Sequence, residues 1–179
     1  MVERIVITGY RNYELAVFQE NDPKITIIKK VLNNRIRSLI ENGAKWFIIS
    51  GALGTEIWSG EVILQLKQEY PEIKLAILFP YASYYEKWNQ KNQEQIQSLI
   101  RQADYIDYVS KQPYTAVTQL TNHTRFLLMH SDGCCLLYDP EFEGKCRYFL
   151  REVQVFQRQH NYPCEQILMD ELENAVFED

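Results

Sequence analysis

The chain has 179 residues and a formal net charge of −5, with 46% hydrophobic and 24% charged residues. This balance excludes a disordered chain, and the length is sufficient to bury a core without disulfide bonds. The acidic balance also argues against a protein that binds duplex DNA through a broad basic face, so we do not expect nucleic acid as a partner.

Short runs of β-branched residues alternate with helical patterns along the whole chain. One helix start is well marked, because the Asp22 side chain can cap a helix whose first position is taken by Pro23. The predicted elements, in chain order, are a strand at Arg4–Thr8, a helix from Pro23 that stops at Asn42, a strand at Trp46–Ser50, a helix ending at Tyr70, a strand at Ile73–Phe79, a helix at Glu86–Ala103, a strand at Asp104–Val109, a helix at Leu120–His130, a strand at Cys134–Tyr138, a helix at Lys145–His160 and a strand at Glu165–Met169.

This alternation favours an α/β fold, a Rossmann-like three-layer sandwich with a mostly parallel sheet and helices on both faces. No linker, repeat or low-complexity segment divides the chain, so we expect residues 1–179 to form a single domain. The N-terminus begins directly with a strand-like segment and shows no signal-peptide order, and no apolar run approaches the roughly 20 residues that span a bilayer. We therefore expect a cytoplasmic protein without membrane insertion.

The cysteines and histidines do not suggest a metal site. The cysteines form no C-x-x-C pair and are expected to be reduced, partly buried thiols: Cys134, Cys135, Cys146 and Cys164. His123 and His130 are seven residues apart on one predicted helix face, but a third ligand is lacking nearby, so no metal is expected.

The loop after the second predicted strand is the strongest candidate for a ligand site. In a parallel sheet, ligands bind beyond the carboxyl ends of the strands. Ser50 ends the strand, and Gly51 and Gly54 let a phosphate or ribose approach a backbone that leads into a helix. Thr55 offers a hydroxyl and Glu56 a carboxylate for ribose hydroxyls. The alternative is a tight turn whose glycines serve strand–helix packing.

The loop after the first predicted strand carries a second candidate set. Gly9 is followed by Tyr10, which can stack on a base, and by Arg11, which can bind phosphate bidentately. A solvated surface turn is the competing interpretation. Trp58 and Tyr81, from the aromatic residues after the second and third strands, lie close to the same predicted crevice.

A third cluster surrounds the fifth predicted strand. Asp132 precedes the strand, and Gly144 follows it where a helix N-terminus can meet an anion. However, Asp139, Glu141 and Glu143 would repel phosphate, so a capped acidic turn is the favoured interpretation. An acid/base pair or a sugar contact is the alternative.

These segments together resemble the YpsA family of the SLOG superfamily, which includes DprA and the lonely-guy phosphoribohydrolases. The resemblance is carried by ITGYR at Ile7–Arg11, SGALGTEIW at Ser50–Trp58, a strand ending in Pro80, and SDGCCLLYDPEFEG at Ser131–Gly144. It extends over nearly the whole chain, including the segment Gln102–Tyr114.

The resemblance implies a nucleotide-derived ligand, such as NAD or ADP-ribose, at the two glycine loops. It points to Gly9, Arg11, Ser50, Gly51, Gly54, Glu56, Trp58 and Asp132 as site residues. It also implies a link to cell division or stress, with cell-division proteins as partners, and self-association into a homo-oligomer. The P-G-G-x-G-T-x-x-E segment of the lonely-guy hydrolases is absent, because the corresponding stretch Tyr138–Gly144 has one glycine and three acids.

Three functions follow from these observations. The first is a sensor or regulatory module that binds a nucleotide-derived ligand, favoured because no nucleophile is marked. The second is a nucleotide N-glycosidase of the phosphoribohydrolase type, with Glu56, Asp132 or Glu143 as the assisting carboxylate. The third is a DprA-like binder of single-stranded nucleic acid, which the acidic balance weakens.

Overall fold

The computed structural model describes residues 2–178 and contains one six-stranded sheet in the order β4-β3-β2-β1-β5-β6. Every paired strand runs parallel to its neighbour. The elements are β1 (Arg4–Gly9), the 3-10 helix η1 (Asn12–Leu15), α1 (Pro23–Glu41), β2 (Trp46–Ile49), α2 (Thr55–Leu66), β3 (Lys74–Tyr81), α3 (Gln90–Gln102), β4 (Tyr105–Ser110), α4 (Thr118–Met129), β5 (Gly133–Leu137), α5 (Cys146–Phe156), β6 (Cys164–Ile167) and α6 (Met169–Val176). The α/β prediction with a parallel sheet is confirmed.

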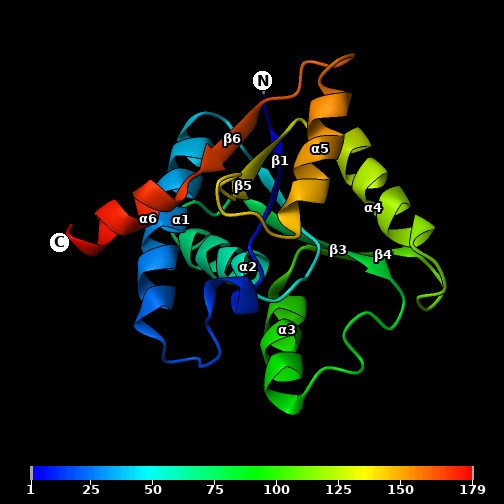
Figure 1. Ribbon diagram of the computed structural model, residues 1–179, viewed down its shortest axis with the longest axis horizontal. Coiled ribbons are helices and arrows are strands. Elements are labelled where there is room, and N and C mark those ends of the chain that lie inside the picture. The colour runs from blue at the N-terminus through cyan, green and yellow to red at the C-terminus, as the bar shows by residue number, and fades with distance from the viewer. Residues whose placement is uncertain (1, 179) are drawn as a thin grey trace.

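Helices cover both faces of the sheet. On one side α1 packs against α2, α2 against α3, and α6 against α1, whereas α4 packs against α5 (Figure 1). Right-handed crossovers between parallel strands place these two sets on opposite faces. The central strands are therefore buried on both sides, and Phe47 and Ile49 of β2 are completely inaccessible to solvent.

The order of the strands reverses at β1. From β1 the chain proceeds outward through β2, β3 and β4, and it then returns to the other side of β1 with β5 and β6. In such sheets a crevice opens at the carboxyl ends of the two strands where the order reverses. The loops after β1 and β5 therefore meet at one place, with the loop after β2 beside them.

The start and the end of α1 follow the predicted signals. The Asp22 side chain accepts a hydrogen bond from the Lys24 backbone N–H at 2.9 Å, and Pro23 is the first helical residue. Beyond the helix, Gly43 has a φ of 109°, a left-handed conformation that suits glycine.

Three local features differ from the sequence-based prediction. The helix expected from Glu86 begins only at Gln90, because Asn89 is its cap and accepts from the backbone N–H of Asn92 at 2.9 Å. The last strand ends at Ile167 and is followed by α6, which was not predicted. A short 3-10 helix, η1, lies within the predicted first loop.

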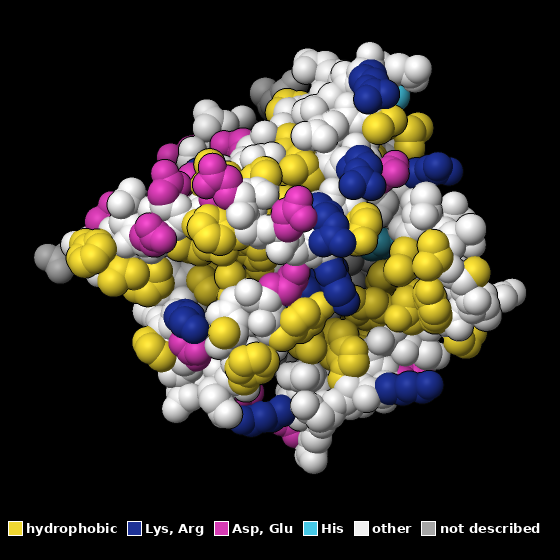
Figure 2. Space-filling view, in the orientation of Figure 1, with side chains coloured by type: hydrophobic (Ala, Val, Ile, Leu, Met, Phe, Trp, Pro, Cys, Tyr) yellow, Lys and Arg dark blue, Asp and Glu magenta, His cyan; other side chains and the backbone are white. Residues whose placement is uncertain are grey.

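Surface side chains are unevenly distributed over the elements. Hydrophobic side chains gather over α4 and β4, while acidic ones gather over α6 (Figure 2). The exposed hydrophobic residues around α4 are Val117, Leu120, Phe126 and Met129. Among the described residues, no helix is both long and apolar enough to cross a membrane.

Candidate ligand site at the carboxyl ends of β1 and β2

A buried carboxylate, that of Glu56, lies between the first two strands. Glu56 stands in the first turn of α2 and its side chain is 2% exposed. One oxygen, Oε1, accepts a hydrogen bond from the Ser50 backbone N–H at 2.6 Å, and the other, Oε2, accepts from Thr8 Oγ1 at 2.8 Å. Glu56 therefore joins the end of β1 to the end of β2 from inside the protein.

The guanidinium of Arg11 completes this cluster. Its Nη1 lies 3.4 Å from Glu56 Oε2 and donates to the Gly9 carbonyl at 3.3 Å. Burial is the largest single influence on the pKa of Arg11 and lowers it, but the charge of Glu56 and smaller contributions from Tyr84, Cys146 and Glu14 together outweigh burial, so the pKa is raised. The side chain is 27% exposed. Within residues 2–178, its Nε and Nη2 donate no hydrogen bond, so they are free to bind an anion.

The two glycines of the second loop are needed for packing. A Cβ on Gly51 would come within 2.4 Å of the Phe79 ring, and one on Gly54 would come within 2.5 Å of the Asn12 backbone nitrogen. Their φ angles of 87° and 100° also lie in the left-handed region. The packing interpretation of these glycines therefore holds, and the close approach at Gly54 is to the first loop.

Thr55 fastens the second loop to the first. Its backbone N–H and its Oγ1 both donate to the Tyr10 carbonyl, at 3.1 and 2.9 Å. The Thr55 N–H, one of the backbone groups at the N-terminus of α2 that has no partner within the helix, is therefore hydrogen-bonded to the Tyr10 carbonyl. The two loops that were predicted to meet at the ligand are in direct contact.

Tyr10 does not occupy the position that the sequence suggested. Its side chain is 2% exposed, and its hydroxyl lies within hydrogen-bonding distance of the carbonyls of Phe142 (2.7 Å) and Asp139 (3.0 Å). The hydroxyl also accepts from the Asp139 backbone N–H at 2.9 Å, and burial raises the pKa of Tyr10 to about 12. The prediction that Tyr10 stacks on a base is wrong, because its ring is needed to anchor the loop after β5.

The N-terminus of α5 is filled by a carboxylate of the chain itself. Glu14 accepts from the Lys145 backbone N–H at 2.8 Å through Oε2, and from the Arg11 backbone N–H at 2.7 Å through Oε1. Gly144 allows this approach, since a Cβ there would lie 2.2 Å from Glu14 Oε2. The place where Gly144 was expected to present a helix end to an anion is thus occupied by Glu14.

Asp132 lies outside the crevice, at the amino end of β5. Its side chain accepts from the Arg4 backbone N–H at 2.9 Å and pairs with the Arg4 guanidinium at 3.0 Å. The hydrogen bond from Arg4 lowers the pKa of Asp132 below its ordinary value. Because a residue that precedes a parallel strand lies at the opposite edge of the sheet, Asp132 does not share a site with Arg11 and Glu56.

Aromatic residues lie beside the cluster. Trp58 is buried in the core at 4% exposure and lines a small cavity of about 60 Å³ together with Gly54 and Asn12. Burial, reinforced by the charge of Glu56, raises the pKa of Tyr84. The sequence alone did not identify Thr8, Glu14 or Tyr84 as site residues. Hydroxyl and carboxylate side chains are common in loops, and the partners concerned are distant along the chain: Glu56 is 48 residues from Thr8, and Lys145 is 131 residues from Glu14.

His123 is buried in the structure as a neutral side chain. Its Nε2 donates to the Leu78 carbonyl at 2.8 Å, and burial lowers its pKa to about 4. Across residues 2–178, no group of three or more His, Cys, Asp or Glu side chains is arranged to hold a metal ion.

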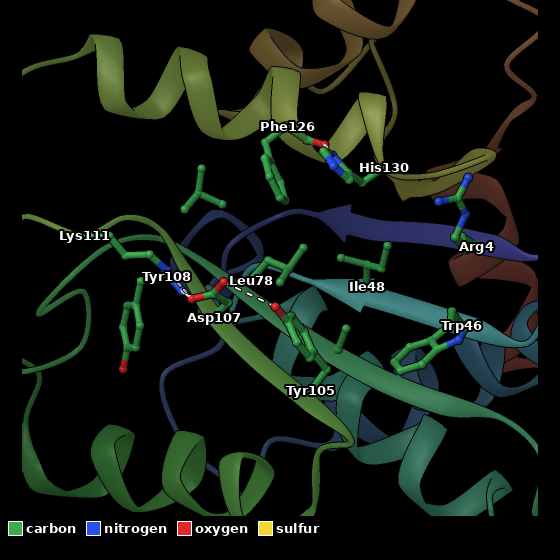
Figure 3. A pocket seen from close by; sticks show the side chains of 12 residues that line it. Arg4, Trp46, Ile48, Leu78, Tyr105, Asp107, Tyr108, Lys111, Phe126 and His130 are labelled. Atoms are coloured by element: carbon green, nitrogen blue, oxygen red, sulfur yellow. Dashed lines mark hydrogen bonds and ion pairs between the residues drawn. The ribbon is translucent and has the colours of Figure 1, made fainter.

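A larger pocket lies elsewhere, on the sheet face beside α4. It has a volume of about 410 Å³, and Phe126 of α4 and His130, which directly follows α4, face Tyr105 and Asp107 of β4 across it (Figure 3). The Tyr105 hydroxyl donates to Asp107 at 3.3 Å at its rim. None of the residues that line it belongs to the loops that carry Arg11 and Glu56, so the two sites are distinct.

Comparison with solved structures supports the fold. The chain is similar to DNA processing protein A from Helicobacter pylori, described as having a unique single-stranded DNA binding mode, with a TM-score of 0.55 at 18% identity. The similarity covers 89% of this chain and 64% of that one, so the chain spans less than two thirds of the solved protein. At this identity the likeness concerns the fold alone.

Comparison of sequences gives much closer relatives. The chain is 46% identical over 178 residues to a UPF0398 protein of Enterococcus faecalis, covering 99% of both chains. A UPF0398 protein of Bacillus velezensis is 38% identical over 98% of this chain and 96% of that relative. The family model YpsA, described as "YspA SLOG family", matches residues 5–172. The chain therefore belongs to the YpsA family of SLOG proteins.

Proposed function

We propose that this protein is a sensor or regulatory module that binds a nucleotide-derived ligand, such as NAD or ADP-ribose, beside Arg11. The observation that carries the proposal is the state of the Arg11 guanidinium. One of its nitrogens is held by Glu56 and the Gly9 carbonyl, while Nε and Nη2 are unpaired within the described chain and the side chain is partly exposed. A guanidinium in this state is prepared for a phosphate.

The surroundings of Arg11 favour a fixed orientation over a flexible one. Glu56 itself accepts hydrogen bonds from Ser50 and Thr8, so the ion pair with Arg11 is anchored to the buried carboxyl ends of β2 and β1. A positively charged group held in this way loses little side-chain freedom when a ligand arrives. Its place at the reversal of the strand order is also where this class of sheet binds nucleotides.

The same contacts argue against the hydrolase alternative. Both oxygens of Glu56 already accept hydrogen bonds, and the carboxylate is almost completely buried. A general acid or base must reach the reacting atom within hydrogen-bonding distance. Asp132 lies at the other edge of the sheet and cannot assist a reaction beside Arg11. In this proposal Glu56 is a positioning residue that orients Arg11.

The position of Glu14 limits where the phosphates of the proposed ligand can bind. Because its carboxylate already binds the N–H groups of Arg11 and Lys145, a second phosphate at the N-terminus of α5 would meet a negative charge. The proposed ligand therefore places one phosphate on Arg11. Through the resemblance to the YpsA family, its binding is proposed to alter contacts with partner proteins, among them cell-division proteins.

The experiment is isothermal titration calorimetry of the purified chain with NAD, ADP-ribose and AMP. Arg11→Gln removes the guanidinium, and Arg101→Gln removes an equal charge from the exposed end of α3 as the matched control. We expect saturable binding by the wild type and the control, and at least about a tenfold loss of affinity in Arg11→Gln, or about 1.4 kcal/mol.

Each mixture is also analysed by chromatography for released base. Binding without base release supports the sensor, whereas base release that is lost in Glu56→Gln would establish the hydrolase instead. Equal affinities in Arg11→Gln and Arg101→Gln, or no binding of any nucleotide, would overturn the proposal. Salt-dependent binding of single-stranded oligonucleotides alone would favour the DprA-like function.

A further inference from the structure

Two cysteines face each other across neighbouring strands. Cys134 of β5 and Cys164 of β6 are register partners in the parallel ladder. Neighbouring parallel strands lie about 4.8 Å apart, which is within the range of roughly 4.4–6.8 Å that separates the Cα atoms of a disulfide. In a parallel ladder, register partners also project to the same face of the sheet, so the two sulfur atoms are on the same side.

The environment makes one member of this pair accessible. Cys134 is buried at 3% exposure, whereas Cys164 is partly exposed and lies at the beginning of β6, an edge strand of the sheet. Solvent and small solutes therefore reach Cys164 from the open edge, while Cys134 is shielded behind it.

The two thiols differ in acidity. A hydrogen bond with Cys134 lowers the pKa of Cys164, whereas the same interaction and burial raise the pKa of Cys134. Because the thiolate is the reactive form and must meet the peroxide, the partly exposed Cys164 is the residue that attacks, and the buried Cys134 is the neighbouring thiol that can resolve the product.

The other cysteines are less suited to this reaction. Cys135 follows Cys134 in β5 and projects to the opposite face, since successive strand residues alternate. Cys146 is the first residue of α5 and is buried, and burial raises its pKa. All four cysteines are free in the structure.

We infer that Cys134 and Cys164 form a site of reversible oxidation, closing an intramolecular disulfide between β5 and β6 when the protein meets a hydroperoxide. The Cys164 thiolate attacks one peroxide oxygen, so that an S–O bond forms, the O–O bond breaks and hydroxide leaves. The Cys134 sulfur then attacks Cys164, forming the S–S bond and breaking the S–O bond. The Cys134 proton goes to the departing oxygen and gives one water, and the proton that Cys164 released on ionisation converts the hydroxide to the second. Two thiols thereby lose two electrons in total, and one hydrogen peroxide is reduced to two waters.

The test treats the reduced full-length protein with hydrogen peroxide, alkylates the remaining thiols under denaturing conditions, and measures intact mass and tryptic peptides. Wild type is compared with Cys164→Ser and with two matched controls, Cys135→Ser and Cys146→Ser. We expect wild type and both controls to lose two alkylatable thiols and to yield a peptide that links Cys134 to Cys164. Cys164→Ser yields no such link, and a thiol reductant restores both thiols.

Two results would overturn the inference. One is oxidation of Cys164 to sulfinic acid in the wild type with Cys134 still free, since a resolving thiol within reach would intercept the sulfenic acid first. The other is a link that joins different cysteines, or one that survives in Cys164→Ser. Neither result depends on ligand binding, so the outcome is independent of the proposed function.

Discussion

Among single residues, the buried side chain of Glu56 determines how stability responds to mutation, and that of His123 determines how it responds to pH. Glu56 meets a backbone N–H, a hydroxyl and a guanidinium, all of which donate to a carboxylate. His123 meets a carbonyl in a site from which a charge is excluded by burial.

Replacement of Glu56 by glutamine is expected to lower the free energy of unfolding by about 2–4 kcal/mol, because the amide turns a donor toward Ser50 N–H or Arg11 and leaves a buried group unsatisfied. The matched control is Glu61→Gln on the same helix, where the carboxylate pairs with Lys29 at the surface and contributes about 0–1 kcal/mol. Urea unfolding measures both. Equal losses in the two variants would contradict the buried role of Glu56.

Because of His123, we expect the free energy of unfolding to decrease on mild acidification. Its pKa falls from 6.5 to about 4 on folding, so between these values the unfolded chain binds more protons. Its contribution is therefore complete above pH 6.5 and is lost as the pH falls toward 4. Urea midpoints measured across this window are expected to fall less steeply in His123→Gln than in the wild type. His160→Gln, at an exposed position, is expected to follow the wild type.

At the scale of elements, the contact between η1 and the N-terminus of α5 depends on a missing side chain. Gly144→Ala would place a Cβ 2.2 Å from Glu14 Oε2 and 3.3 Å from the Tyr10 ring. We expect it to lower the free energy of unfolding by about 1–3 kcal/mol, as overpacking does. In a Glu14→Ala background the same change is expected to cost less. Chemical denaturation of the four proteins of this double-mutant cycle measures the difference, and strict additivity would contradict it.

The elements that could be predicted from the sequence are those with strong local signals. Asp22 and Pro23 started α1, and the apolar strands marked the centre of the sheet. The helix α6 escaped prediction, because only Ala175 of its eight residues is buried and its stability draws on a distant ion pair between Arg35 and Glu171. Short elements of this kind are stabilised by tertiary contacts that no local pattern shows.

The candidate site was predictable only in part, for the same reason. Glycine loops after parallel strands pointed to the carboxyl edge of the sheet, and the structure brings Arg11, Ser50 and Glu56 together at that edge. Whether a loop side chain faces inward depends on residues far along the chain, as Tyr10 shows by anchoring a loop about 130 positions away. Asp132 precedes β5 and pairs with Arg4 at the opposite edge of the sheet.

For the whole molecule, the strand order predicts a single cooperative unfolding transition. The sheet joins β5 and β6 to β1, so neither half of the chain has a complete sheet of its own. Trp46, Trp58 and Trp88 report the first half by fluorescence, and alkylation of the buried Cys135 reports the second. Coincident midpoints are expected for both signals. Separate midpoints would show two domains in place of the predicted one.

The hydrogen bonds that converge on Tyr10 have a consequence for the proposed binding of a ligand. Its carbonyl receives both donors of Thr55 and its hydroxyl holds the loop after β5, so three loops form one preorganised unit. The loss of conformational entropy that ordering such loops requires occurs on folding. The ligand that we propose at Arg11 would then have little loop disorder to remove. A partner would recognise the bound state from the exposed surface of that ligand, without the closure of a lid.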